Sequence, residues 1–381
     1  MSARTGWLQL GGWRWVFLVM VSAGAVASLL VAEYGLGATT GLNDSIPWGL
    51  CLGLNVFCGI ALAAGGFTLA TVAFVLGGGE WQIVGRASLL AGSIGYVVAM
   101  LGMIANEAPR SRLLATLVRG WTLRSILSGA VWTCVLLAAL LFIEFLPEYS
   151  SRLKRKRKLA RLHRLELPLL LLLTILATLH QFGFNRLIML AGTRFSPLWS
   201  GPSLSLMFYM SSVSAALAVL LFSSWRSGVA FGKSLPQSLL PVIARGLTVA
   251  VFVYLVIRLM DLIERGLFSA MFSTLHEGLL LLLELVLLLI GMIWIKGNEQ
   301  QPRELFIGSA LILAGFMANR LNTAITALEA GAGQRYLPRW SEFLIAYSLV
   351  AVGVGAFALG VKHLAVFSEA DADLPVGLSP G

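Results

Sequence analysis

The chain has 381 residues, of which 58% are hydrophobic and only 12% are charged, and its mean hydropathy is +0.85. This composition excludes a soluble domain, and repeated apolar runs long enough to cross a bilayer predict a helical membrane protein with many spans. The net charge of +10 does not indicate a nucleic-acid partner, because basic loops are how membrane proteins set their orientation.

The apolar runs predict ten membrane-spanning helices. The expected fold is therefore an all-α, polytopic transmembrane bundle, with a four-helix bundle in 1–150, a basic loop at 151–164 and a six-helix bundle in 165–381. A removed signal peptide is the alternative for the first run, which is too long for an ordinary signal core. The predicted spans are 15–36, 46–76, 86–106, 124–146, 165–190, 202–223, 239–262, 268–295, 305–328 and 342–364.

The basic loop is the strongest topological signal. Eight lysines and arginines fall within 151–164, and such a cluster between two spans belongs in the cytoplasm, where it also meets anionic lipid. Ten spans then put both chain termini in the cytoplasm. Arg110, Arg112 and Arg119 fall in an outer loop, against the rule. We interpret this loop as a docking surface for an acidic partner, or as a loop that is simply tolerated.

The second span begins after a polar turn, with Pro47 where a helix can start. Its small residues recur four apart, which lets two helix backbones approach closely in lipid. One amide, Asn55, lies inside this run. Two interpretations are open for it: an interhelical hydrogen bond, or the wall of a ligand cavity. The spaced pairs are Gly49 with Gly53, Gly59 with Ala63, and Ala61 with Gly65.

Polar and ionisable side chains inside the spans are costly, so each is a candidate for function. Glu284, near the middle of the eighth span, needs either a raised pKa or a cation such as Arg320. It is either a proton carrier or a static hydrogen-bonded group. The candidate proton path comprises His180, Arg258, Asp261, Glu277, Glu284 and Arg320.

Haem is the other use of membrane histidines, and a bis-histidine site needs two of them at one depth. His180 and His276 are the deep pair in this sequence. Two histidines in ten spans are few for a cytochrome b. The three cysteines form no CxxC pair, so neither a metal site nor an iron–sulfur cluster is predicted in this chain.

Several stretches together resemble the integral membrane subunits of the polysulfide reductase and NrfD family, most closely its HybB-type branch, the membrane subunit of nickel–iron hydrogenase 2. They lie in order over the second to tenth spans. The matching stretches are Leu42–Gly66, Glu144–Glu148, Leu179–Gln181, Ser196–Trp199, Asn319–Asn322 and Tyr336–Glu342.

The resemblance implies a multi-pass anchor in the bacterial inner membrane, without haem or an iron–sulfur cluster of its own, that binds menaquinone or ubiquinone. Electrons would pass between the quinone and a periplasmic ferredoxin-like iron–sulfur subunit, which exchanges them with a catalytic subunit. The branch usually has Asp where this chain has Asn55, and an amide cannot carry a proton. The implied quinone site, near the outer face of the first bundle, comprises Glu33, Tyr34, Asn55, Tyr96, Glu107 and Trp132.

The predicted function is thus electron exchange with the quinone pool as a subunit of a respiratory redox complex, with proton translocation as a second role. Three alternatives stay open from the residues. A secondary transporter would have inverted repeats and helices broken at mid-membrane, and the glycines of the second span have no counterpart in the second half. A purely structural anchor would bind no quinone, and a b-type cytochrome would show a haem spectrum.

Overall fold

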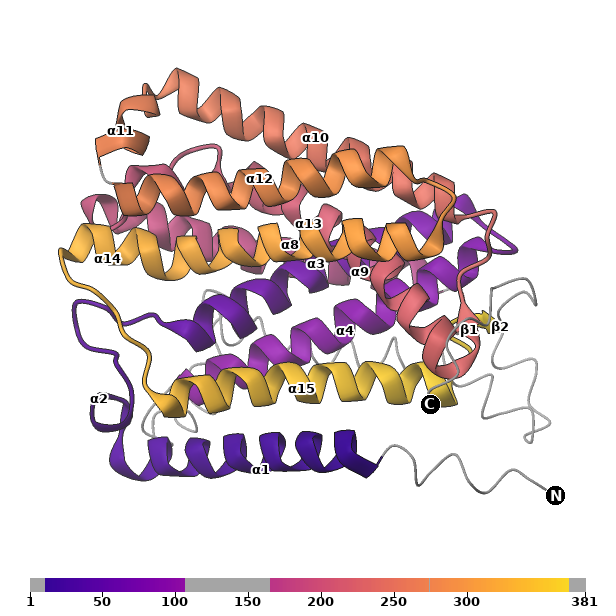
Figure 1. Ribbon diagram of the computed structural model, residues 1–381, viewed down its shortest axis with the longest axis horizontal. Helices are drawn as coiled ribbons and strands as arrows, with labels where there is room; N and C mark the ends of the chain where they lie inside the picture. Colours follow the sequence, from indigo (N-terminus) through magenta and orange to yellow (C-terminus); the bar gives the residue numbers. More distant parts are fainter. Residues whose placement is uncertain (1–10, 107–164, 274, 370–381) are drawn as a thin grey trace.

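The computed structural model describes residues 11–106, 165–273 and 275–369 (Figure 1). In these ranges nine helices are long and apolar enough to cross a membrane. They correspond to nine of the ten predicted spans, and the all-α polytopic bundle is confirmed. The remaining predicted span (124–146) and the basic loop (151–164) lie outside the described residues.

The spanning helices run roughly along one axis of the molecule (Figure 1). They are α1 (Gly11–Tyr34), α3 (Cys58–Leu76), α4 (Trp81–Asn106), α8 (Glu166–Leu190), α9 (Leu204–Phe231), α10 (Leu240–Glu264), α12 (Leu275–Gly297), α13 (Pro302–Leu321) and α15 (Trp340–His363). The shorter elements are α2 (Leu36–Thr39), the π-helical turns η1 (Leu52–Phe57) and η5 (Asn322–Thr326), the 3-10 turns η3 (Gly192–Arg194) and η4 (Pro197–Trp199), α11 (Phe268–Ser273), α14 (Ala327–Ala332), β1 (Lys233–Ser234) and β2 (Ser368–Glu369).

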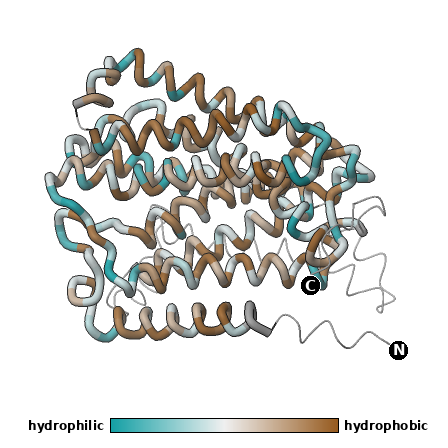
Figure 2. Tube along the Cα trace, in the orientation of Figure 1, coloured by the Kyte–Doolittle hydropathy of each residue, from teal (hydrophilic) through white to brown (hydrophobic). Residues whose placement is uncertain are grey.

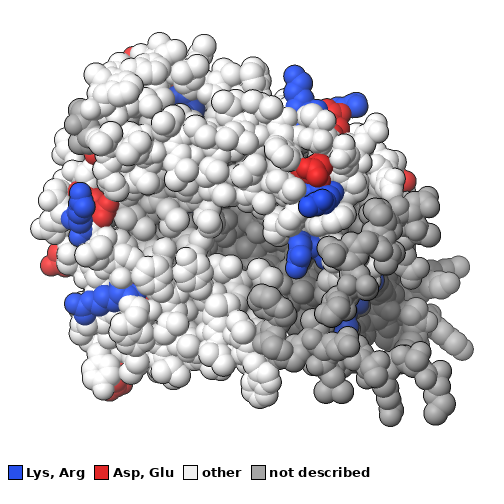
Figure 3. Space-filling model, viewed as in Figure 1, with Lys and Arg blue, Asp and Glu red and all other residues white. Residues whose placement is uncertain are grey.

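The outer surface of the bundle is apolar along the middle of the helices. Figure 2 shows hydrophobic colour along their length and hydrophilic colour at their ends and in the connections. Long apolar side chains such as Ile175, Val249 and Ile293 are exposed on this surface, which a bilayer would cover. In Figure 3 the charged side chains gather at the two ends of the molecule, with a broad belt between them that is nearly free of charge.

Helix α3 lies at the centre of the described core and packs against α4, α8 and α9. The predicted close approach of small residues is confirmed. A Cβ atom added at Gly66 would lie 2.7 Å from the Ser88 carbonyl oxygen of α4, and one added at Gly65 would collide with the Ser212 carbonyl of α9. Backbone-to-backbone packing of this kind holds helices together in lipid, where apolar side chains gain little from leaving the solvent.

The two halves of the chain share this core. Helix α15, from the C-terminal half, packs against both α1 and α4, and α3 packs against α8 and α9. The predicted division into bundles of four and six helices stays a prediction, because the fourth span and the connecting loop lie outside the described residues. Within those residues, however, helices from both sides of the proposed boundary are interleaved.

The two ends of the bundle differ in charge. One end, which we call the basic end, carries Arg226, Lys233, Lys296 and Lys362 together with the start of α1 and the end of α15. All the described lysines lie there. The opposite end, which we call the acidic end, carries Glu33, Asp44, Asp261, Glu277 and Glu329 beside arginines such as Arg194, Arg265 and Arg339, but none of the described lysines. The positive-inside rule assigns the basic end to the cytoplasm, in agreement with the orientation predicted from the sequence.

A two-stranded clasp closes the basic end. Strands β1 and β2 pair antiparallel, with Lys233 opposite Glu369 and Ser234 opposite Ser368. The Lys233 ammonium donates to the carbonyl oxygens of Val361 (2.9 Å) and Lys362 (3.2 Å), in the last turn of α15. Those carbonyls have no partner within the helix, so the lysine caps it.

Candidate functional site

A hydroxyl–imidazole pair lies buried where α4 meets α8. The Tyr96 hydroxyl and His180 Nδ1 are 3.3 Å apart, and the two rings face each other at 5.9 Å with a tilt of 47°. Both side chains are almost fully enclosed. Tyr96 is a predicted quinone-binding residue and His180 a predicted member of the proton path, and the structure brings the two together.

A small cavity adjoins this pair. It measures about 10 Å³, and its remaining lining is apolar: Ile60, Ala99, Met100, Met103 and Phe184. A space of that size holds about one water molecule. Met100 and Met103 are only half-buried, and methionine adapts its shape more easily than branched side chains. Movement of these two residues would widen the cavity toward the lipid.

The second polar centre surrounds Glu284 on α12, which is 0% exposed. Its two carboxylate oxygens accept hydrogen bonds from four neutral donors. Tyr254 (3.2 Å) and Asn319 (2.8 Å) donate to Oε1, while Trp199 (3.3 Å) and Asn322 (3.4 Å) donate to Oε2. The donors come from α10, α13, η4 and η5, so one carboxylate ties four elements together.

Two asparagines three apart reach the same carboxylate because residues at this spacing lie on one face of a helix. Asn319 ends the regular part of α13 and Asn322 begins η5. Arg320, between them, points instead to α9. It donates to Ser211 Oγ (2.6 Å) and the Phe208 carbonyl (3.2 Å), and its guanidinium lies 3.8 Å from the Phe208 ring centre. Its Nη1 has no hydrogen-bond partner among the described residues.

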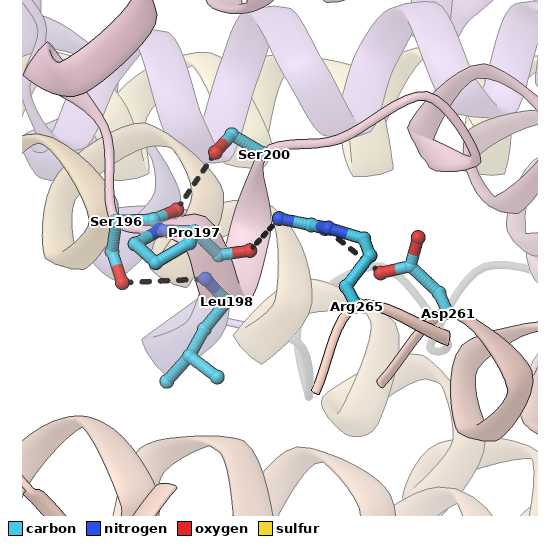
Figure 4. Close-up of polar contacts among 6 residues, drawn as sticks. All are labelled: Ser196, Pro197, Leu198, Ser200, Asp261 and Arg265. Atoms are coloured by element: carbon cyan, nitrogen blue, oxygen red, sulfur yellow. Dashed lines mark hydrogen bonds and ion pairs between the residues drawn. The ribbon is translucent and has the colours of Figure 1, made fainter. Parts of the chain in front are cut away.

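The segment 196–200 enters the bundle from the acidic end and carries Trp199 to Glu284. Ser196 Oγ donates to Glu277 Oε2 (2.6 Å), and the Ser200 hydroxyl donates to the Ser196 carbonyl (3.0 Å). Arg265 donates to the Pro197 carbonyl (2.7 Å) and pairs with Asp261 Oδ2 (3.0 Å) (Figure 4). These bonds hold the loop against the end of α10 and the start of α12.

Two further buried charges lie on the same face of α10 as Tyr254, at spacings of four and seven residues. Arg258 is 2% exposed, and its Nε and Nη2 have no hydrogen-bond partner among the described residues. Asp261 is equally buried and its Oδ1 is likewise without one. Buried polar atoms of this kind are usually satisfied by water.

The remaining predicted quinone residues lie apart from the Tyr96–His180 pair. Glu33 and Tyr34 are exposed at the end of α1, which packs on α15. Asn55 is fully buried in η1, and its Nδ2 donates to the Ala346 carbonyl of α15 (3.0 Å), which is the interhelical hydrogen bond of the first interpretation. Glu107 and Trp132 lie outside the described residues, as do the docking arginines Arg110, Arg112 and Arg119.

The structure brings most of the predicted proton-path residues to one region but moves His180 to the other centre. It also adds two members, Trp199 and Tyr254, that sequence reasoning missed. Both are aromatic residues, Tyr254 in an apolar run and Trp199 in a loop, where such residues usually mark packing. The one signal that could have found Trp199 is the stretch SPLW, which is part of the resemblance.

These features define a multi-pass helical protein of a bacterial inner membrane with two buried polar centres.

The chain is similar along nearly its whole length to a protein described as a probable Ni/Fe-hydrogenase 2 b-type cytochrome subunit, from Escherichia coli (strain K12). The two are 25% identical over 350 residues, 90% of this chain and 89% of that one. A protein from Nitratidesulfovibrio vulgaris is 25% identical over 367 residues, 93% of each chain. No protein-family model matches the sequence. The resemblance predicted from the sequence is confirmed.

The similarity also corrects one prediction. A chain without haem was expected, but the Escherichia coli relative is described as a b-type cytochrome, a name that denotes a haem protein. Of the histidines that the structure describes, His180 is buried, whereas His276 and His363 are exposed near opposite ends of the bundle. The cavity beside His180 is too small for a porphyrin. The described residues thus do not fit a bis-histidine haem in this conformation.

Proposed function

We propose that the chain is the membrane subunit of a hydrogenase-type respiratory complex and exchanges electrons with the quinone pool at the Tyr96–His180 pair. The observation that carries the proposal is the pair itself. A phenol and an imidazole at hydrogen-bond distance, beside an apolar cavity with flexible methionines, suit a quinone, which has two carbonyl acceptors on an apolar ring.

In this proposal Tyr96 and His180 donate hydrogen bonds to one quinone carbonyl and exchange its proton during reduction. The apolar wall excludes water from the ring. Electrons arrive through an iron–sulfur subunit docked at the acidic end, and a hydrogenase subunit lies beyond it. The name of the Escherichia coli relative supports a hydrogenase partner.

The test uses the purified complex with a short-chain quinone and measures the quinone reduction rate. Tyr96→Phe and His180→Gln are expected to lower the rate by about a hundredfold or more, because a positioned proton donor typically contributes about 10²- to 10⁴-fold. Tyr209→Phe is the matched control, because Tyr209 is a half-buried tyrosine that contacts only the Thr68 hydroxyl (3.2 Å) in a comparable way. Equal rates in all three variants would exclude this site. An absorption spectrum of the same preparation reports any haem separately.

Proton movement through Glu284 is a second candidate function. It is favoured by the buried atoms of Arg258 and Asp261 that have no described partner, because water at those atoms would connect Tyr254 and Glu284 with the acidic end. In vesicles, Glu284→Gln is expected to lower the number of protons moved per electron. An unchanged ratio, at a normal electron-transfer rate, would dismiss the idea.

A further inference from the structure

A second cavity, of about 300 Å³, opens at the basic end between α3, α4 and α8. Its polar lining is Gln82 and Arg86 of α4 and Glu166, the first residue of α8. Apolar side chains, among them Phe74 and Leu170, form the other walls. A polar cavity of this size holds several water molecules. It belongs to neither of the two centres described above.

One face of α4 leads from this cavity to the Tyr96–His180 pair. Arg86, Leu89, Ser93 and Tyr96 follow one another at spacings of three, four and three residues, which is the repeat of a single helix face. Arg86 and Leu89 line the cavity, Ser93 is buried, and Tyr96 meets His180. At ~1.5 Å per residue, the cavity residue Arg86 and Tyr96 are ~15 Å apart along the helix.

The facing helix repeats the arrangement. On α8, Glu166 and Leu170 line the cavity, Ala177 follows on the same face, and His180 ends the stripe. The residue beside this stripe, Thr174, has its hydroxyl 3.1 Å from the hydroxyl of Thr71 on α3. The interval between cavity and pair therefore holds these hydroxyl groups among buried apolar side chains, which include Phe67, Leu173 and Ala177.

These hydroxyls are suited to passing protons. Ser93 Oγ donates to the Leu89 carbonyl (2.6 Å), and Thr174 Oγ1 donates to the Leu170 carbonyl (2.9 Å). A hydroxyl keeps two acceptor lone pairs while it donates, and it can rotate to exchange one partner for another. Leu89 and Leu170, whose carbonyls accept these bonds, line the cavity. Each hydroxyl therefore lies about one helical turn from the cavity wall.

We propose that the basic-end cavity is the mouth of a hydrated route that supplies protons to the Tyr96–His180 pair. This rests on the proposed quinone function. A quinone that receives two electrons from the iron–sulfur partner takes up two protons and becomes a quinol, with no leaving group. Those protons are drawn from the basic-end side, through Glu166 and the hydroxyls of Ser93 and Thr174.

The test reconstitutes the whole complex in vesicles with a pH-sensitive dye in one compartment, a short-chain quinone and a chemical reductant for the iron–sulfur partner. Protons are expected to disappear from the compartment that the basic end faces. Glu166→Gln, Ser93→Ala and Thr174→Val are each expected to slow turnover about tenfold while the quinone dissociation constant stays as in the unmodified complex. Thr68→Val is the matched control, because Thr68 makes the same kind of bond to the Ala64 carbonyl but contacts Tyr209 instead.

Three results would overturn the proposal: proton uptake on the acidic-end side, equal turnover in the variants and the control, or a turnover loss that anionic lipid restores, which would make the cavity a lipid headgroup site. If one buried variant does not fold, Glu166→Gln at the rim still decides the outcome. Failure of the unmodified complex to bind quinone is a separate result, which rejects the proposed function itself.

Discussion

The two buried polar centres differ in what surrounds them. Glu284 receives four donors from four elements and is wholly enclosed. At the other centre, the Tyr96 hydroxyl and His180 Nδ1 are 3.3 Å apart, next to a cavity and two half-buried methionines. A carboxylate that already accepts several hydrogen bonds, which we call a saturated carboxylate, loses much if one of its donors is removed, whereas a hydroxyl–imidazole pair beside a cavity can exchange partners at smaller cost.

This difference separates two roles that the sequence alone could not separate. It indicates that the donors around Glu284 hold helices α10, α12 and α13 together whatever else the group does. It indicates equally that ligand exchange belongs to the Tyr96–His180 centre.

Glu284→Leu is expected to have the largest effect on stability. It leaves four buried donors without an acceptor, and breaking a buried charged network of this kind costs about 3–5 kcal/mol. Thermal unfolding of the purified protein in detergent measures the loss. Glu284→Gln, which keeps one acceptor oxygen, is expected to lose clearly less. A leucine variant as stable as the unmodified chain would show that the centre is not structural.

Tyr336 extends the contrast to a second saturated carboxylate, Glu342, at the acidic end. Glu342 accepts hydrogen bonds from the Tyr336 hydroxyl and from the backbone N–H groups of Gly41 (2.7 Å) and Arg339 (3.0 Å), while the Leu50 N–H donates to Tyr336 (2.9 Å). Tyr336→Phe is expected to cost about 1–3 kcal/mol, because two partners are left unsatisfied. The unfolding temperature at neutral pH measures this loss of stability. An unchanged unfolding temperature would show that the hydrogen bonds of Glu342 do not stabilise the fold.

The same residue gives a pH dependence. Burial, and then the hydrogen bond to Glu342, raise the pKa of Tyr336 above its ordinary value. Because the folded-state pKa exceeds the unfolded value of about 10, the stabilisation is fully present below pH ~10 and is lost as the pH rises toward the folded-state pKa. The unfolding temperature of the unmodified chain should therefore fall more steeply between pH ~10 and ~11 than that of Tyr336→Phe. If the unfolding temperatures of the two proteins fall equally with pH, Tyr336 is not the origin of the pH dependence.

His180→Gln is expected to change stability by less than about 1 kcal/mol, because glutamine keeps a polar group beside the cavity that can still meet the Tyr96 hydroxyl. The proposed role in proton exchange nevertheless predicts a large loss of quinone reduction. Unfolding and turnover measured on one preparation reveal whether the two quantities separate. A variant that unfolds as readily as Glu284→Leu would remove the contrast between the centres.

Lys233→Met, far from both centres, is expected to have the smallest effect on stability. It removes the ammonium that caps α15 but keeps the length of the side chain. A loss of about 0.3–1 kcal/mol is expected, the usual worth of a cation at a helix C-terminus. Arg245→Met is the control, because that exposed residue pairs with Glu299 (2.7 Å) at the same end and surface pairs contribute little. A larger effect of Arg245→Met would reverse this ranking.

The sequence predicted much of the fold and part of the site. Apolar runs located the spans, and small residues four apart predicted the contacts of Gly59 and Gly65. The polar residues of the eighth and ninth spans marked Glu284 and Asn319–Asn322 as special. Partners were harder to predict. Trp199 is 85 residues from Glu284 and Tyr96 is 84 from His180, and no local pattern joins residues so distant in the chain.

Bilayer thickness and loop charge act on each segment separately, so the residues alone predicted where the described apolar helices lie and which end carries the described lysines. Which buried polar groups meet depends on how the helices pack. In lipid, most helix faces are equally apolar, so the pairing of helices depends on backbone fit at a few glycines and on hydrogen bonds between distant residues. These place His180 beside Tyr96 and Trp199 beside Glu284, and they leave Glu33 and Tyr34 exposed at the end of α1.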